Sequence, residues 1–367
     1  MNAVKFSDVF VKTAAVLCLT AAMALGASSA SLTMGKADLK SAGQLAFGPD
    51  GILFVGDSTN ATIVALDSED RLPARSGGKI EIKGINQKIA AILGTAPDQI
   101  LINDVAVNPI SKKVYLSVSR GRGPDAAALI FRVDASGKIS ELTLDNIKHS
   151  MVSLPDAPVS KTGGKGPNPR METITHLAFI DGNVVVAGLS NEEFSSSLRS
   201  IPFPFQKAST GSSIEIYHGS HGRFETNAPV RTFVPFNINS EPYILAAYTC
   251  TPLVKIPVSA LKPGAKVKGA TIAELGNHNR PLDMVAYTKN GKDYILMANS
   301  SRGIMKLTAT GLDSYQPITA QTEVTGVPYE TIASFKGVQQ LDKFDDANAL
   351  MLIDNEGSLD LRTVPFP

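Results

Sequence analysis

The chain has 367 residues, of which 43% are hydrophobic and 19% are charged, and its net charge is +1. A chain of this length and composition can build a large buried core. The balanced charge excludes the basic field typical of proteins that bind nucleic acid. With only two cysteines, the chain also cannot be a disulfide-rich scaffold.

The first thirty residues resemble a secretory signal peptide. Lys5 and Lys12 precede an apolar run over 14–27, and small residues follow up to Ala30. The apolar run is shorter than the roughly 20 residues of a membrane-spanning helix. We therefore predict that 1–30 are cleaved and that 31–367 form a single domain in the periplasm or outside the cell. This domain is expected to be a monomer without stable membrane insertion.

A short repeating pattern organises the remaining chain. A turn over 48–51 separates two β-type runs; Pro49 presets its φ angle, and Gly51 tolerates a positive φ. Similar pairs of β-type segments recur at 52–55 with 62–66, 114–118 with 129–133, 184–188 with 213–217, 243–247 with 253–257, 294–298 with 303–307, and 350–354 with 358–362. Six such units predict an all-β fold, a six-bladed β-propeller.

Further segments complete the predicted blades. We expect inner strands at 44–47, 104–107, 175–179, 283–287 and 330–334, with a weak candidate near 237–240. We expect outer strands at 79–82, 139–144, 230–234, 270–275 and 318–324. The sixth unit runs out of chain, so an N-terminal strand over 31–39 is predicted to close the ring. Apolar residues at helical spacing within 83–102 predict a short helical insertion in a loop.

Long connections are predicted to gather on one face of the disc. The connections between second and third strands, and those between blades, share a face, and we expect the segments 83–102, 145–172 and 190–212 to belong to them. Long loops on a rigid scaffold commonly carry function. This loop-rich face is therefore where we expect a small molecule or a protein partner to bind.

Two stretches carry a resemblance to known propellers. Leu45-Ala-Phe-Gly-Pro-Asp-Gly with Ile52-Leu-Phe-Val-Gly-Asp, and Ile102-Asn-Asp-Val-Ala-Val-Asn-Pro with Val114-Tyr-Leu-Ser, resemble NHL-repeat propellers. They are also similar to the gluconolactonase and senescence-marker-protein propellers. The resemblance covers most of 31–367 at the level of blades and implies the propeller fold.

The lactonase resemblance also implies a divalent metal, often calcium, held by oxygen ligands at the mouth of the channel. Asn103 and Asp283 resemble two of the family's ligand positions, whereas Gln44 stands where the family has a glutamate. Glu172 would replace that glutamate, and Glu330 was also expected at the start of an inner strand. Oxygen atoms of this kind suit a hard cation. The alternative is that these side chains cap turns between blades.

Five basic residues are candidates for binding an anionic ligand or an acidic partner. They lie in connections assigned to the loop-rich face and are Arg120, Arg122, His278, Arg280 and Arg302. Guanidinium groups bind carboxylate and phosphate groups well. Pairing with neighbouring acidic residues is the alternative interpretation.

Two histidines in His218-Gly-Ser-His221 have the spacing of a pair of metal ligands. They fall in a predicted outer turn of the third blade, away from the channel, and two histidines alone are a weak zinc or copper signal. A solvated turn is the competing interpretation. Cys250 is the one cysteine of the predicted mature chain, either an exposed thiol or a buried inert one.

These patterns favour an exported propeller that binds a ligand or partner without chemistry of its own. The alternative is a metal-dependent hydrolase, of the calcium type, that acts on lactones or related esters. No sequence motif of a phosphate loop or a serine nucleophile elbow is present. The sequence therefore predicts the fold more closely than the activity.

Overall fold

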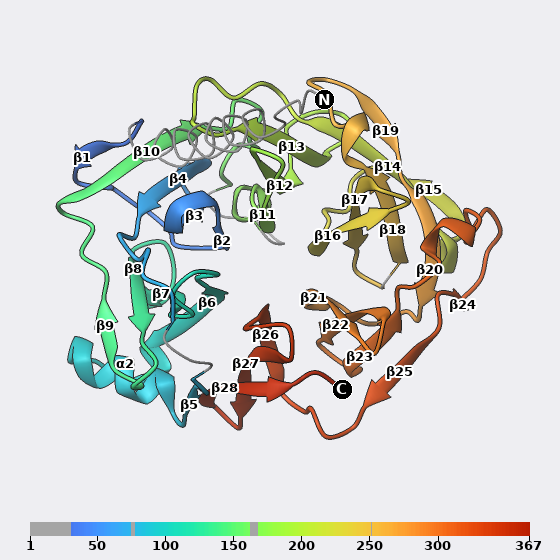
Figure 1. Ribbon diagram of the computed structural model, residues 1–367. Helices are drawn as coiled ribbons and strands as arrows, with labels where there is room; N and C mark the ends of the chain where they lie inside the picture. Colours follow the sequence, from blue (N-terminus) through green and yellow to red (C-terminus); the bar gives the residue numbers. More distant parts are fainter. Residues whose placement is uncertain (1–30, 75–77, 162–167, 251) are drawn as a thin grey trace, which may run out of the picture.

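Six mostly antiparallel β-sheets stand around a central axis in the part of the chain that the structure describes (Figure 1). The computed structural model describes residues 31–74, 78–161, 168–250 and 252–367, so the predicted signal peptide lies outside the described residues. The predicted six-bladed β-propeller is confirmed. Over these residues, every helix falls short of the length and apolar character that crossing a bilayer requires.

The first three blades, taken from the inner strand outward, use mainly strands from the first two thirds of the chain, with β19 added from later in the sequence. Blade one contains β2 (Leu45–Phe47), β3 (Ile52–Asp57), β4 (Thr62–Asp67), β10 (Ile147–Ser153) and β1 (Thr33–Gly35). Blade two contains β6 (Ile100–Val107), β7 (Val114–Arg120), β8 (Ala127–Val133) and β9 (Ile139–Glu141). Blade three contains β11 (His176–Ile180), β12 (Asn183–Leu189), β13 (Ser196–Pro202) and β14 (Ser212–His218), with β15 (Arg223–Glu225) and β19 (Lys266–Lys268) beside β14.

The other three blades use the C-terminal part of the chain and one short earlier strand. Blade four contains β16 (Thr232–Ile238), β17 (Glu241–Ala247), β18 (Pro252–Pro257), β20 (Ala270–Leu275) and β24 (Val324–Gly326). Blade five contains β21 (Pro281–Lys289), β22 (Lys292–Asn299), β23 (Gly303–Thr308) and β25 (Tyr329–Ile332). Blade six contains β26 (Val338–Lys343), β27 (Asn348–Asn355), β28 (Ser358–Pro365) and β5 (Glu81–Ile82).

The order of blades around the ring differs from their order in the chain. Among the inner strands, β2 contacts both β6 and β11, and β26 contacts both β21 and β6. The spatial order is therefore two, one, three, four, five, six, and Figure 1 shows blade one between blades two and three. The chain turns back after blade two, and β10 pairs with β4 along the edge of blade one before blade three begins.

The predicted closing strand is wrong in its residues. Within 31–39, β1 pairs with β10 at the edge of blade one, whereas β5 pairs with β28 and supplies the outer strand of blade six. The segment 79–82, predicted as an outer strand of blade one, is thus what completes blade six. A β-type run has the same local pattern whichever strand it pairs with, so its sequence does not identify that strand.

Several other strand assignments also change. The segment 230–234 overlaps the inner strand β16, and 330–334 overlaps the outer strand β25. The segment 213–217, predicted as the third strand of blade three, is the fourth strand, β14. The third strand is β13, which pairs with β12 and has the weakly hydrophobic sequence Ser-Ser-Leu-Arg-Ser-Ile-Pro. The segment 318–324 ends at β24, which pairs with blade four.

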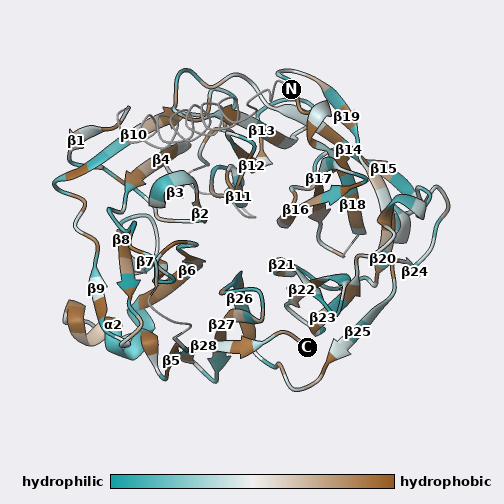
Figure 2. Ribbon diagram, in the orientation of Figure 1, coloured by the Kyte–Doolittle hydropathy of each residue, from teal (hydrophilic) through white to brown (hydrophobic). Residues whose placement is uncertain are grey.

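The core consists of hydrophobic clusters between adjacent blades. Phe54 of blade one and Val186 of blade three share one cluster, and Val105 of blade two and Leu352 of blade six share another. The clusters between blades one and two, three and four, four and five, and five and six complete the set in the described residues. Hydrophobic residues accordingly appear along the strands of every blade in Figure 2. The central strands are buried on both faces, which explains runs such as Ile52-Leu-Phe-Val.

The predicted helix is confirmed as α2 (Ile85–Leu93), which packs against β28 and β6. Ile85 and Ile89 are fully buried, so the helix covers the junction of blades six and two. It ends at Gly94, whose φ of 63° is the left-handed conformation that favours glycine after a helix. Short 3-10 turns occur at Pro49–Gly51, Pro97–Gln99, Pro169–Glu172, Gly219–His221, Val258–Ala260 and Leu312–Ser314. In the first of these, Gly51 has the predicted positive φ, 71°.

Candidate functional site

The central channel contains a cavity of about 710 Å³ to which all six inner strands contribute side chains. Its wall combines polar side chains with apolar and aromatic ones, and Phe47, Phe179, Phe233 and Met284 are among the latter. Ionisable groups also line it; they are Asp104, Lys112, His176, Asp283, Asp342, Lys343, Asp345 and Asp346. A concave site that combines apolar surface with placed polar groups is the usual form of a small-molecule site.

The cavity extends toward the turns between first and second strands. Its lining includes Pro109 and Lys112 of the β6–β7 turn and Asp345 and Asp346 of the β26–β27 turn. It therefore opens on the face opposite the predicted loop-rich one. Long connections also occur on this face, because 203–211 and 258–269 join third to fourth strands or their extensions. The expectation that the long loops gather on one face is thus wrong.

Two buried aspartates hold neighbouring inner strands together. Asp104 accepts hydrogen bonds from the N–H of its neighbour Val105, at 2.8 Å, and from the N–H of Leu45 in blade one, at 2.7 Å. Asp283 in blade five accepts from Met284 N–H and from Leu341 N–H in blade six, both at 2.8 Å. Each side chain sits at a β-bulge, which turns it toward the next blade.

Asp342 makes the same kind of bridge nearer the open end of the channel. One carboxylate oxygen accepts from Val107 N–H of blade two and the other from Lys343 N–H, both at 2.6 Å. The three aspartates thus link blade two to one, five to six, and six to two. Each carboxylate oxygen has two lone pairs, so acceptor capacity remains for a ligand donor.

Burial changes the acidity of these groups. Burial, and then the negative charge of Asp283, raise the pKa of Asp104 well above its usual range. Burial raises the pKa of Asp283 to about 7 and that of Asp342 to about 6. A carboxyl with a pKa near neutrality can hold or release a proton under physiological conditions, so the channel can present either a hydrogen-bond donor or a negative charge.

A histidine faces the same cavity from blade three. The His176 ring packs edge-on against Phe233, with 4.7 Å between ring centroids, and its Nδ1 lies 3.5 Å from Thr232 Oγ1. Thr232 Oγ1 also lies 3.5 Å from a carboxylate oxygen of Asp283. Burial lowers the pKa of His176 to about 4, so the imidazole is neutral at physiological pH.

The four predicted metal ligands do not share a location. Glu330 lies on the outer strand β25, exposed, with a carboxylate oxygen 3.0 Å from Lys306 Nζ. Its predicted place at the start of an inner strand is therefore wrong. Asn103 lies in β6 and donates to Ala42 O and Ser119 Oγ, at 2.8 and 2.9 Å. Asp283 lines the channel as described above.

Glu172 ends a 3-10 turn before blade three and pairs with an arginine that the sequence analysis missed. Its Oε1 lies 2.6 Å from a terminal nitrogen of Arg231, which precedes the inner strand of blade four. Burial, and then the positive charge of Arg231, lower the pKa of Arg280, which precedes blade five. Glu172, predicted as a metal ligand, and Arg280, predicted as an anion ligand, thus belong to one charged group together with Arg231.

The other predicted basic residues divide between two blades. His278 and Arg302 lie near Arg280, since His278 O accepts from Ser301 Oγ at 3.0 Å and Arg302 donates to Asn277 O at 3.0 Å. Arg120 ends β7, and Arg122 donates to Asp98 O at 2.6 and 3.0 Å. These two belong to blade two, which blade six separates from blade five. The five residues therefore lie in two groups, one at blade two and one beside blade five.

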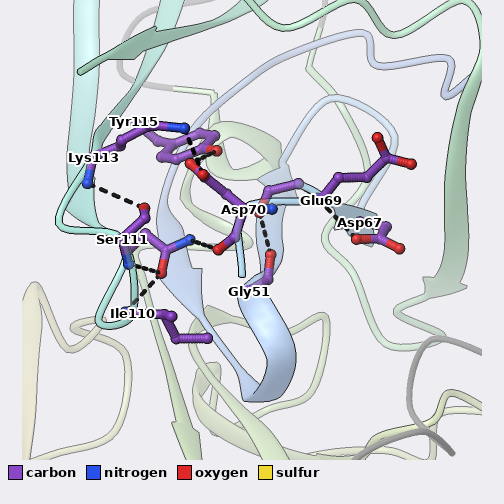
Figure 3. Close-up of polar contacts among 10 residues, drawn as sticks. Gly51, Asp67, Glu69, Asp70, Ile110, Ser111, Lys113 and Tyr115 are labelled. Atoms are coloured by element: carbon purple, nitrogen blue, oxygen red, sulfur yellow. Dashed lines mark hydrogen bonds and ion pairs between the residues drawn. The ribbon is translucent and has the colours of Figure 1, made fainter. Parts of the chain in front are cut away.

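A second cavity of about 690 Å³ lies at the junction of blades one and two. Figure 3 shows its polar network around Asp70, whose carboxylate accepts from Lys113 Nζ at 2.6 Å and from Tyr115 OH at 2.8 Å. Asn108 Nδ2 donates to Asp70 O at 2.9 Å. Burial, and then the Asp70 charge, raise the pKa of Tyr115 to about 12. This network ties Asp70, which follows β4 of blade one, to Lys113, Tyr115 and Asn108 of blade two, so it is a structural junction between the blades.

The sequence analysis missed Asp342, His176 and Arg231 as site residues. Asp342 was missed because the inner strand of blade six was placed at 330–334. Asp104 and Asp283 each precede apolar residues in an inner strand, but Asp342 precedes Lys343 at the end of its strand and carried no such signal. His176 and Arg231 carried no signal beyond their places beside inner strands.

Comparisons with known proteins bear on the fold alone. No protein-family model matches the chain, and no curated protein matches it. Solved structures that are similar include a glucose dehydrogenase, 14% identical with a TM-score of 0.38, covering 91% of this chain and 100% of that one. The PQQ-bound form of aldose sugar dehydrogenase from Streptomyces coelicolor is 11% identical with a TM-score of 0.31, covering 90% and 96%.

A structure of Drosophila Plexin A in complex with Semaphorin 1b is similar to the same extent. It is 11% identical with a TM-score of 0.37, covering 91% of this chain and 86% of that one. Likenesses this low carry no conclusion about chemistry. The resemblance to NHL-repeat and gluconolactonase propellers stays a prediction, and the six-bladed propeller is what the strand pairing shows.

Proposed function

We propose that this protein is an exported binding protein that holds a small molecule in its central channel, without chemistry of its own. The observation that carries the proposal is the cavity of about 710 Å³ lined from all six blades. Its volume lies within the roughly 300–1,000 Å³ of known small-molecule sites. The proposal keeps the predicted binding role and moves the site from the loop-rich face to the channel.

The lining residues favour a particular class of ligand. Phe47, Phe179 and Phe233 offer flat apolar surfaces, which suit an aromatic or aliphatic body. Acidic side chains outnumber lysines in the lining, with five aspartates against two lysines. A ligand with an apolar body and an amine or other hydrogen-bond donor would satisfy both features.

The experiment is a thermal-shift screen of the purified mature protein with aromatic and aliphatic amines and with matched carboxylic acids. A ligand that binds only the folded protein raises the melting temperature. We expect amines to raise it more than the acids of the same size. Hits are then measured by calorimetry at pH 8, where Asp342 is ionised more fully than at pH 5.

A substitution at the cavity wall separates channel binding from surface binding. Ala178 lines the cavity from β11, so Ala178→Phe should fill part of it and weaken binding of a hit by tenfold or more. Ala178→Ser at the same place keeps the volume and serves as the matched control. Ala286→Phe, on the wall contributed by blade five, repeats the test if the first variant is unstable. Equal affinity in the filled and control variants contradicts the proposal.

A further inference from the structure

Three metal-ligand side chains from two blades meet at the outer junction of blades three and four. His218 ends β14, His221 lies in the 3-10 turn Gly219–His221, and Cys250 lies in the connection between β17 and β18. One possible ligand atom from each lies within 4.8 Å of the others. The two imidazole centroids are 3.9 Å apart. Folding therefore adds to the histidine pair the third ligand that the sequence pattern lacked.

A glutamate orients both imidazoles. Glu225 Oε2 lies 2.8 Å from His218 Nδ1, and Glu225 Oε1 lies 2.7 Å from His221 Nδ1. When a carboxylate accepts from Nδ1–H, the lone pair of the neutral ring is on Nε2. Carboxylates bonded to ligand histidines in this way are a common outer shell of zinc sites.

The Nε2 atom of His218 has no hydrogen-bond partner among the described residues. The side chain is only 3% exposed, and this nitrogen is fully buried. Buried polar atoms without a partner are uncommon because leaving one unpaired costs about 1–3 kcal/mol. A bound metal ion would supply the missing interaction.

The backbone around the three residues is fixed by hydrogen bonds to neighbouring segments. Gly219 N–H donates to Glu274 Oε1 at 2.5 Å, and Cys250 N–H donates to Asn279 O at 2.7 Å. Thr271 Oγ1 donates to Tyr217 O at 2.6 Å, which holds the end of β14 against β20. A site whose ligands are held before binding loses little conformational entropy on binding.

We propose that His218, His221 and Cys250 bind one thiophilic transition-metal ion, Zn²⁺ or copper, between blades three and four. Imidazole and thiolate ligands suit these ions, whereas calcium and magnesium prefer oxygen ligands. The Cys250 thiol releases its proton to solvent when the thiolate binds the ion. Three protein ligands leave one position of a tetrahedral zinc ion to water. Glu225 acts as a positioning residue through the two rings.

Metal binding is tested on the purified mature protein after treatment with a chelator. Zn²⁺ is added against a chromophoric competitor, and Co²⁺ is added separately because a cobalt–thiolate bond gives a charge-transfer absorption band. We expect about one ion per chain, a cobalt–thiolate band, and a higher melting temperature with Zn²⁺. Copper is titrated in parallel, and stoichiometric binding of either metal through Cys250 supports the proposal.

Variants decide whether these residues are the ligands. Cys250→Ser and His221→Gln should each weaken metal binding on the order of 100-fold, and Cys250→Ser should abolish the cobalt–thiolate band. His149→Gln, which changes a histidine in β10 of blade one, should leave binding unchanged. Melting of the metal-free variants checks that they fold.

If the wild-type protein binds much less than one equivalent of either metal, or gives no cobalt–thiolate band, the three residues are not a metal site. Equal binding by the wild type and Cys250→Ser means an adventitious ion elsewhere. Because the wild-type cobalt spectrum needs no variant, the proposal is tested even if a substitution prevents folding.

Discussion

The central channel and the outer junction of blades three and four both collect ionisable side chains, but they differ in how fully those groups are paired. In the channel, both carboxylate oxygens of Asp104, Asp283 and Asp342 accept backbone N–H groups. At the outer junction, the His218 Nε2 atom and Glu274 Oε2 are buried without a hydrogen-bond partner in the described part of the chain.

This difference in pairing separates groups that stabilise the ring from groups that still lack a hydrogen-bonding or metal partner. The channel aspartates connect neighbouring blades, so the space beside them can admit a small molecule without breaking the fold. The outer junction lacks an interaction that its histidine needs. Candidate sites are therefore better ranked by unmet hydrogen bonds than by the number of charged residues present.

The largest effect is expected from removing a channel carboxylate. Asp283→Ala leaves the buried N–H groups of Met284 and Leu341 without an acceptor, at a cost of about 1–3 kcal/mol each. We expect the free energy of unfolding to fall by roughly 2–5 kcal/mol in denaturant titration. Asp346→Ala, at the cavity mouth and fully exposed, should leave it nearly unchanged. Equal effects would refute the bridging role.

A smaller effect is expected at the outer junction. Glu225→Gln keeps the size of the side chain but removes the charge that holds both imidazoles. Zn²⁺ affinity should fall by about 10–100-fold, as for other carboxylates that orient ligand histidines. Competition titration measures the change. A variant that binds Zn²⁺ as tightly as the wild type would show that Glu225 does not position the ligands.

The pH dependence of stability tests the burial of the channel groups. The Asp283 pKa is about 7 in the folded protein and 3.8 ordinarily, so between these values the native state holds a proton that the unfolded chain has lost. Its contribution is full below about pH 4 and is lost as the pH rises through about 7. His176 acts in the opposite direction, because its pKa falls from 6.5 to about 4, so stability decreases as the pH falls through that range.

The two contributions are separated by comparing one variant with the wild type. Asp283→Asn cannot titrate, so only the wild type loses the Asp283 contribution between pH 5 and pH 8. We therefore expect the advantage of the wild type over Asp283→Asn to be larger at pH 5 than at pH 8. Denaturant unfolding at the two pH values measures this advantage. An advantage that is the same at both pH values, or that grows with pH, would mean that the Asp283 pKa is not raised.

The smallest effect is expected at Glu274 in the metal-free protein. Burial raises the pKa of this carboxyl to about 7, and its Oε2 has no partner in the described residues. Glu274→Gln removes an unfavourable buried charge and keeps an acceptor for Gly219 N–H, so stability at pH 8 should change by less than about 1 kcal/mol. A loss of stability comparable to that of Asp283→Ala would contradict the difference in hydrogen-bond pairing between the channel and the outer junction.

Local sequence patterns were sufficient for many of the elements but not for their partners. The turn at Gly51, the helix α2 and six pairs of β-type runs follow from residue type and spacing, and the propeller follows from their repetition. The ring order and the closing strand β5 do not, since pairing between distant segments leaves no local pattern. The errors in strand assignment also caused errors in the predicted site residues, because Glu330 was assigned to an inner strand and Asp342 was overlooked.

The candidate sites depended even more on tertiary structure. Asp283 was recognised as an acidic residue at the channel, but its role as a bridge depends on the N–H of Leu341, far along the chain. Likewise, His218 and His221 were visible as a pair, whereas Cys250 joins them only because blades three and four are adjacent. Contacts between blades, rather than motifs, define both regions.

The most direct test of channel binding is a crystal structure of the protein with the strongest amine from the screen. We predict density for the ligand inside the ring, with its apolar part against Phe47, Phe179 and Phe233 and its donor group toward the channel aspartates. Density for the ligand on the outer surface, with an empty channel, would contradict the proposal.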